Sequence, residues 1–235
     1  MALYITGDTH GVQDIQKVIN WYNALEMKLT EDDVLAICGD TSIAHFYGTP
    51  EGKRALSVFN TMKITIVYVD GNHENFEKLN SLPVEEWKGG KVHRHSDNVL
   101  HLMRGQVFDL DGIKVFTLGG ATSPDKHKRL LGYDYFKEED IQFCDTEEAL
   151  TNLAKHNNEV DLIITHTIGR EFIYKRMYKD AHANESYMGA INNFLDYIDE
   201  IVKYKAWYFG HFHMDIDYIG SNKYAMYNRI TKIRV

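Results

Sequence analysis

The sequence has little cysteine, little proline and no long apolar run. Its 235 residues include 2 cysteines and 3 prolines. Cys38 and Cys144 are too few for a disulfide framework or a four-thiolate zinc site. No apolar stretch approaches the roughly 20 residues that a membrane helix needs, and the N-terminal residues lack the basic start and apolar core of a signal peptide. We therefore expect a cytoplasmic protein that is not bound to a membrane.

Positive charge is also scarce. The chain has 26 Lys and Arg against 34 Asp and Glu, which gives a formal net charge of −8. An acidic balance is unfavourable for a protein that grips nucleic acid by its phosphates, so we expect no stable nucleic-acid partner. A phosphate-ester substrate stays compatible with this charge if bound metal ions supply the positive field. The 12 histidines are the residues that need an explanation.

The rest of the composition is that of a globular protein. Hydrophobic residues make up 44% of the chain and aromatic residues 12%, which is enough to fill a core. No internal repeat, low-complexity tract or linker rich in proline and glycine divides the sequence. We therefore expect a single domain over residues 1–235.

Short apolar runs alternate with helical patterns along the chain. Leu3–Thr6, Val34–Cys38 and Ile64–Val69 predict buried strands separated by helices, the pattern of a parallel sheet. The later segments predict more strands, a hairpin turn at Asp111-Gly112 and two helices near Glu138–Lys155 and Ala190–Tyr204. The later strands are expected over Val99–Met103, Val107–Leu110, Ile113–Leu118, Leu162–Thr165 and Ala206–Phe209, followed by antiparallel strands near the C-terminus. The fold class is therefore α/β, a four-layer α+β arrangement of two mixed sheets packed as a sandwich and flanked by helices.

Five predicted strands end in residues that can bind a metal ion. Ligand sites of α/β sheets form beyond the carboxyl ends of the strands, so strand ends that are distant in sequence can meet there. Carboxylate, imidazole and amide ligands suit manganese, iron, zinc or nickel. Seven ligands are too many for one tetrahedral ion but fit two ions about 3.5–4 Å apart that share a carboxylate. The strand-end clusters are Asp8-Thr9-His10, Asp40, Asn72-His73-Glu74, His166 and His211-Phe212-His213.

These residues belong to a series of short motifs. In chain order the motifs are Asp8-Thr9-His10, Gly39-Asp40, Gly71-Asn72-His73-Glu74, His166 and Gly210-His211-Phe212-His213. The series resembles that of the calcineurin-like metallophosphoesterases, which is D-x-H, G-D, G-N-H-[DE], a single H and G-H-x-H. The resemblance implies a metal-dependent hydrolase of phosphate esters with two divalent ions, manganese or iron being expected ahead of zinc or nickel.

The resemblance also implies a role for each residue. Asp8, His10 and His213 would hold one ion, and Asn72, His166 and His211 would hold the other. Asp40 would bridge the two ions. His73 would lie just outside them, either as a general acid or as an electrostatic stabiliser of the leaving group. Glu74 would orient a ligand or serve as a charge at a helix N-terminus, and we expect the helix role.

The motifs are similar to those of the branch that contains protein Ser/Thr phosphatases and diadenosine tetraphosphatases. That branch carries a G-D-x-x-D-R-G motif whose arginine grips the phosphate. Here the residues after Asp40 are Thr41-Ser42-Ile43-Ala44-His45, which lack the second aspartate and the arginine. Arg129 or Arg170 could supply the substrate contact from another loop.

Three functions are compatible with these motifs. We expect a phosphomonoesterase that acts on a phosphoprotein or a small phosphate ester. The first alternative is a phosphodiesterase or nucleotide pyrophosphohydrolase, and the second is a catalytically silent scaffold, which would have lost ligands that this sequence keeps. Residues 168–188 lie between His166 and His211 and mix basic with aromatic residues, so they are a candidate lid. The remaining histidines, among them His45, His93 and His95, are expected to be structural or solvated.

Overall fold

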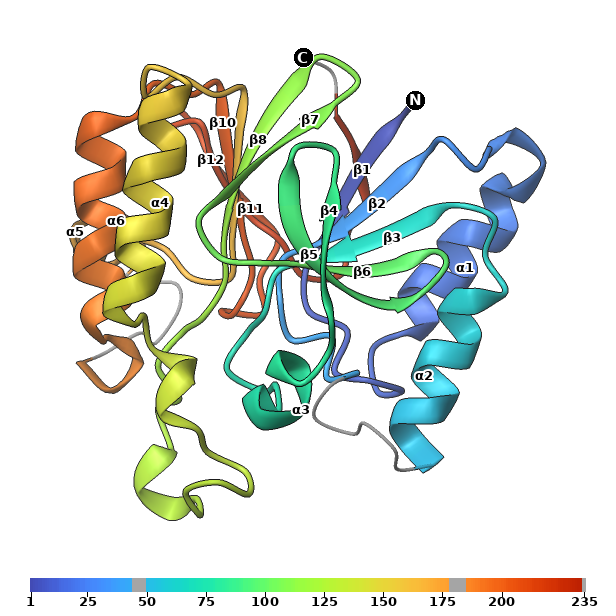
Figure 1. Ribbon diagram of the computed structural model, residues 1–235, viewed down its shortest axis with the longest axis horizontal. Coiled ribbons are helices and arrows are strands. Elements are labelled where there is room, and N and C mark those ends of the chain that lie inside the picture. Colours follow the sequence, from blue (N-terminus) through green and yellow to red (C-terminus); the bar gives the residue numbers. More distant parts are fainter. Residues whose placement is uncertain (44–49, 178–184, 234–235) are drawn as a thin grey trace.

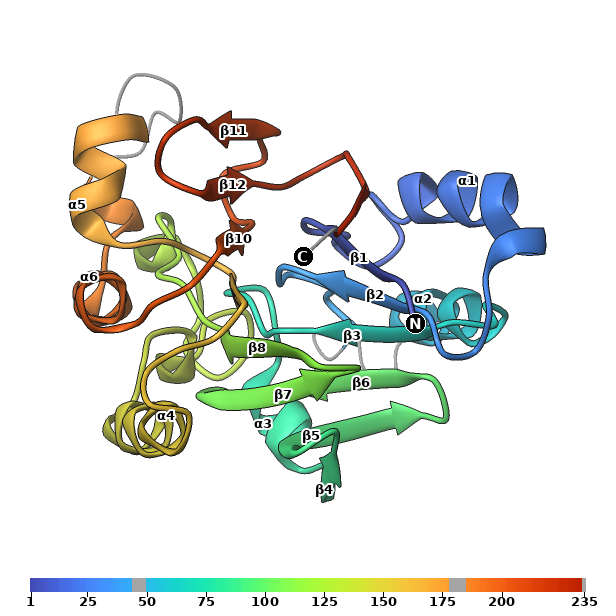
Figure 2. The same cartoon turned by 90° about the horizontal axis from the view of Figure 1, so that it is seen from above.

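Two mixed β-sheets pack face to face, and helices cover the outer side of each (Figure 1, Figure 2). The computed structural model describes residues 1–43, 50–177 and 185–233. One apolar core fills the space between the sheets, and a further core lies under the helices on each side. The predicted fold class is confirmed.

The first sheet has seven strands in the order β13-β1-β2-β3-β6-β5-β4. Its four central strands run parallel: β1 (Leu3–Thr6), β2 (Val34–Ile37), β3 (Thr65–Tyr68) and β6 (Val99–Leu102). Its outer strands pair antiparallel: β4 (Val84–Trp87), β5 (Gly90–Ser96) and β13 (Thr231–Lys232). The central strands are buried on both faces. In β2, Val34 joins the core between the sheets and Leu35 joins the core under the helices, which explains the continuous apolar runs.

The second sheet has six strands in the order β11-β12-β10-β9-β8-β7. Four strands run parallel: β8 (Ile113–Leu118), β9 (Leu162–Thr165), β10 (Ala206–Phe209) and β12 (Lys223–Ala225). The edges pair antiparallel: β7 (Gln106–Leu110) and β11 (Ile216–Tyr218). The predicted hairpin turn between β7 and β8 is confirmed, with positive φ angles of 60° at Asp111 and 87° at Gly112. The C-terminal strands are not all antiparallel as predicted, because β12 pairs in parallel with β10.

The helices other than α3 lie on the two outer faces (Figure 2), and α3 (Phe76–Asn80) lies below the strands in the view of Figure 1. Two cover the first sheet, α1 (Gln16–Leu25) and α2 (Pro50–Asn60), and the others are α4 (Phe143–Lys155), α5 (Arg170–Phe172) and α6 (Ala190–Ile201). Shorter helical turns span Glu26–Lys28, Lys126–Lys128, Lys137–Glu139, Ile173–Met177 and Glu185–Tyr187. The helix predicted from Glu138 begins only at Phe143. Among the described residues, no helix is long and apolar enough to cross a membrane.

Candidate metal centre

The carboxyl ends of the parallel strands of both sheets point to one edge of the sandwich. Because the sheets pack face to face, the residues that follow these strands meet there. From the first sheet come Asp8, His10, Asp40, Asn72 and His73, and from the second come His166, His211 and His213.

The backbone turns sharply at several of these residues. His10, Asp40, His211 and His213 have left-handed φ angles of 42°, 46°, 68° and 50°. This conformation is uncommon for residues other than glycine, costs of the order of 1–3 kcal/mol and gathers at functional sites. Space is equally tight, because a Cβ on Gly71 would lie 2.0 Å from Oδ1 of Asp40. The glycine before a ligand is therefore required by close approach, as the motif predicts.

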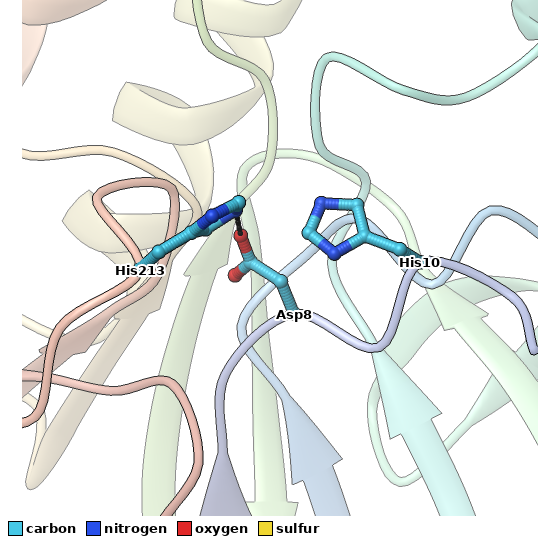
Figure 3. Close-up of side chains that lie close together, drawn as sticks. All are labelled: Asp8, His10 and His213. Carbon is cyan, nitrogen blue, oxygen red and sulfur yellow. Dashed lines mark ion pairs between the residues drawn. The ribbon is translucent and has the colours of Figure 1, made fainter. Parts of the chain in front are cut away.

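The first group of candidate ligands is Asp8, His10 and His213 (Figure 3). Each offers one ligand atom, and these atoms all lie within 4.8 Å of one another. Nε2 of His213 is 3.2 Å from Oδ2 of Asp8. Nδ1 of His10 is 2.7 Å from Oδ2 of Asp14, so that the other ring nitrogen faces Asp40 at 3.6 Å. Two imidazoles thus converge on a buried carboxylate.

The second group is Asp40, His166 and His211, which meets the same 4.8 Å condition. Nε2 of His166 lies 3.3 Å from Oδ2 of Asp40 and 3.2 Å from Oδ1 of Asn72. Nδ1 of His166 lies 2.7 Å from the carbonyl oxygen of Cys38, which leaves Nε2 to face the centre. Asp40 also forms a third group with His10 and His73. The carboxylate of Asp40 is therefore shared between neighbouring groups.

Opposite charges compensate each other in the centre. Burial opposes ionisation of Asp40, but His166 and His73 outweigh it and hold the pKa of Asp40 well below its usual value. Burial also disfavours a charged His166, yet Asp40 and Asp8 raise its pKa to about 10. At His211 burial dominates and, together with the charge of His166, lowers the pKa to about 3. Ionised carboxylates and a neutral imidazole are the forms that bind a cation.

His211 supplies the most direct test of whether an ion fits. Its Nε2 atom is buried and, among the described residues, has no hydrogen-bond partner. A buried polar atom without a partner costs about 1–3 kcal/mol, and coordination to a metal ion would remove that cost. Carboxylate and imidazole ligands suit borderline divalent ions. The residues present therefore fit a divalent cation.

A cavity of about 230 Å³ opens beside these groups. Asp40, His73 and His211 line it, together with Arg129 from the loop between β8 and α4. Nη1 of Arg129 is 3.3 Å from Nδ1 of His73, and Nε pairs with Asp125 at 2.8 Å. The cavity thus combines the candidate ligands with an arginine that is distant in sequence.

Comparison with known proteins identifies the family. Residues 1–215 match the calcineurin-like phosphoesterases. The chain belongs to this family. It is therefore a metal-dependent phosphoesterase with a His/Asp metal-binding site. Among solved structures, it is similar to phosphopantetheinyl hydrolase from Mycobacterium tuberculosis, with 13% sequence identity, a TM-score of 0.47 and coverage of 99% of this chain and 95% of that one. No curated protein sequence matches significantly.

Further residues of the phosphoesterase hold the ligands in place. Asp14, four residues after His10, fixes the His10 ring, and this spacing is a signal that the sequence contains. Ser123 accepts a hydrogen bond from Nδ2 of Asn72 at 3.0 Å, which turns Oδ1 of Asn72 toward His166. No local pattern marks Ser123, because its partner is more than 50 residues away.

Glu74 corrects an expectation. Its carboxylate is 1% exposed and accepts hydrogen bonds from Oγ1 of Thr41 and the backbone of Ser42, both at 3.1 Å. Helix α3 begins after it, with Asn75 as the N-terminal cap. Burial and the nearby charge of Asp40 raise the pKa of Glu74 to about 8. Glu74 therefore fixes the loop behind Asp40, and the expected role as a helix charge is wrong.

Several other predicted residues lie away from the cavity. Arg170 is bonded to Glu185 at 3.1 Å and does not line it. Of the candidate lid at 168–188, Tyr187 lines the cavity, while residues 178–184 lie outside the described part of the chain, as does His45. His93 packs against His101, with 3.1 Å between their Nδ1 atoms, and His95 bonds the Tyr68 hydroxyl at 2.6 Å. The expected structural role of these two histidines agrees with these contacts.

Proposed function

We propose that this phosphoesterase hydrolyses phosphate monoesters, from a phosphoprotein or a small molecule, at a two-ion centre. The observation that carries the proposal is the sharing of Asp40 between neighbouring groups of ligands, because a bridging carboxylate needs that position. Bound manganese or iron ions would clamp the phosphate oxygens and lower the pKa of a shared water that attacks phosphorus. One ion would be held by Asp8, His10 and His213 and the other by Asn72, His166 and His211, with Asp40 between them.

We propose that His73 assists the departure of the leaving group. Its backbone N–H donates to Oδ1 of Asp40 at 2.8 Å, which fixes the residue over the bridging carboxylate. Its ring lines the cavity, where it can hold a proton for the departing oxygen or stabilise the charge that develops there. Burial and the charge of Arg129 lower the pKa of His73, while Asp40 opposes this shift. A phosphate dianion that pairs with Arg129 would offset the guanidinium charge and so favour a protonated His73.

Arg129 supports a monoester as the substrate. A monoester carries up to two negative charges and a diester carries one, so a cation beyond the metal ions favours the monoester. The Arg129 guanidinium is held by Asp125 and also bonds the Asp134 carbonyl at 3.2 Å, so it is oriented before substrate arrives. Its planar fork can contact two phosphate oxygens at once. Arg170 has no place in this proposal.

A second candidate has its own support. Tyr187 and Phe212 line the same cavity with ring centroids 6.2 Å apart. Aromatic side chains are the usual platform on which a nucleobase stacks. This pair favours a phosphodiesterase or nucleotide pyrophosphohydrolase as the alternative.

Both cysteines are free and Cys38 is buried, which supports the cytoplasmic setting that we propose for either activity.

Two model esters separate the candidates. The purified chain with Mn²⁺ should hydrolyse p-nitrophenyl phosphate faster than bis(p-nitrophenyl) phosphate, and the opposite preference would favour the alternative. Arg129→Met should slow the monoester more than the diester, because it removes the extra cation. Arg170→Met is the matched control and should change neither rate. A chain that binds no transition metal and cleaves neither ester would refute the proposed function.

A further inference from the structure

The ring of Tyr227 lies flat against the ring of His213. Their centroids are 4.6 Å apart and their planes differ by 8°. His213 needs such support, because its side chain is 48% exposed, compared with 14% for His10 and 0% for Asp8. An exposed imidazole is free to change rotamer unless a neighbour restrains it. Tyr227 is that neighbour.

Tyr227 is itself firmly held. Its backbone N–H donates to Oδ1 of Asp215 at 2.8 Å, and Nζ of Lys17 lies 4.8 Å from the centroid of its ring. The same ammonium donates to the backbone carbonyls of Asp8 and Tyr227. One lysine thereby ties the strand end that carries Asp8 to the segment that carries Tyr227.

The segment around Tyr227 is also pressed against the metal-binding turn. A Cβ on Gly7 would lie 2.0 Å from the carbonyl oxygen of Met226, so only glycine fits before Asp8. Tyr227 is therefore held in place beside the strand end that carries Asp8.

We propose that Tyr227 is a positioning residue for the first ion-binding group. Its ring fixes the orientation of His213. The proposal rests on the two-ion centre proposed above. Tyr227 lies beyond residues 1–215, the part that matches the family, so the family match does not assign it this role. Loss of a residue that orients a metal ligand typically weakens metal binding about 10- to 100-fold.

Calorimetric titration of the metal-depleted full chain with Mn²⁺ tests the proposal. The wild-type chain should bind two ions. Tyr227→Leu should weaken one binding event about 10- to 100-fold and leave the other close to the wild-type value. Tyr227→Phe keeps the ring, so both binding events should stay close to their wild-type values. Tyr224→Leu is the matched control, because Tyr224 stacks on Tyr208 at 4.9 Å in the neighbouring strand, away from the ligands.

Each result has one meaning. Wild-type affinity for both ions in Tyr227→Leu would overturn the role of Tyr227 and leave the two-ion centre standing. Equal weakening in Tyr227→Leu and Tyr224→Leu, with equal loss of thermal stability in the metal-free chains, would reduce the effect to general destabilisation and overturn it too. If Tyr227→Leu does not fold, Tyr227→Met, which also removes the ring, decides, and an unchanged affinity counts against the role. A wild-type chain that binds no Mn²⁺ would instead refute the proposed function.

Discussion

Gly71→Ala is the smallest change that should disable the centre. The added Cβ would lie 2.0 Å from Oδ1 and 2.5 Å from the backbone nitrogen of Asp40, whereas ordinary contacts begin at 3.4 Å. The carboxylate would have to move by about 1.4 Å to restore ordinary contact. Displacement of a reacting group by about 1 Å can cost about 10²-fold in rate. Asp40 belongs to the second and third groups and is the proposed bridge between the two ions, so we expect at least this loss in kcat/KM and weaker binding of Mn²⁺.

The assay is hydrolysis of p-nitrophenyl phosphate in saturating Mn²⁺, with thermal unfolding of the metal-free chain beside it. Overpacking of a buried site costs about 1–3 kcal/mol, so some loss of stability is expected. Gly169→Ala controls for that loss, because its Cβ would lie 2.2 Å from a carboxylate oxygen of Asp196, which lies on α6 away from the cavity. The control should lose stability and keep its activity. A folded Gly71→Ala chain with wild-type kcat/KM would show that the position of Asp40 does not matter.

Three further predictions concern His73, Asp40 and the pair His93 and His95. His73→Gln should lower kcat about 10²- to 10⁴-fold, the usual share of general acid catalysis, while the number of bound Mn²⁺ ions stays the same in metal analysis. Asp40→Asn should lower both turnover and the number of bound ions, and a full metal complement in that variant would contradict its bridging role. Burial, together with His101, lowers the pKa of His93 to about 4 and of His95 to about 3, against 6.5 in the unfolded chain. Unfolding therefore takes up protons below about pH 6.5, so the free energy of unfolding of the metal-free chain should fall from pH 6.5 toward pH 4. Denaturant titrations should show a smaller fall in His93→Gln than in the wild-type chain. An equal fall would contradict the lowered pKa of His93.

The parts of the fold that the sequence predicts are those buried on two sides. Every residue of β2 is buried, so Val34–Ile37 is visible as an uninterrupted apolar run. Strand β4 is different, because Val84 and Glu86 are exposed and its pattern resembles a loop. The prediction of antiparallel C-terminal strands is wrong for β12, which pairs in parallel with β10, because strand direction depends on the path of the chain between the two strands rather than on their residues.

The site shows the same division between local and distant signals. Strand-end motifs predict the candidate ligands because each motif is short and follows an apolar run. Asp14 is within the reach of local patterns, since it is four residues from His10. Arg129 and Tyr227 are brought to His73 and His213 by loops that fold back from elsewhere in the chain. The sequence offers Arg129 only beside Arg170 and does not single out Tyr227, because basic or aromatic character alone does not place a residue at the site; the packed structure makes both selections.

A comparison with Asp70 shows why Asp8 and Asp40 are suited to bind metal ions and Asp70 is not. Asp70 is 1% exposed, like Asp40, and also follows a strand of the first sheet. His101 contacts Asp70 at 3.1 Å, and Arg104 contacts it at 2.6 Å; Arg104, with His101, holds the pKa of Asp70 below the usual value despite burial. A guanidinium keeps its proton, so this pair is permanent. Among the described residues, the ion pairs of Asp8 and Asp40 are formed with imidazoles, which can give up a proton and become ligands themselves. A divalent ion can therefore replace those protons, and an acidic chain gains positive charge at the place where a phosphate has to bind.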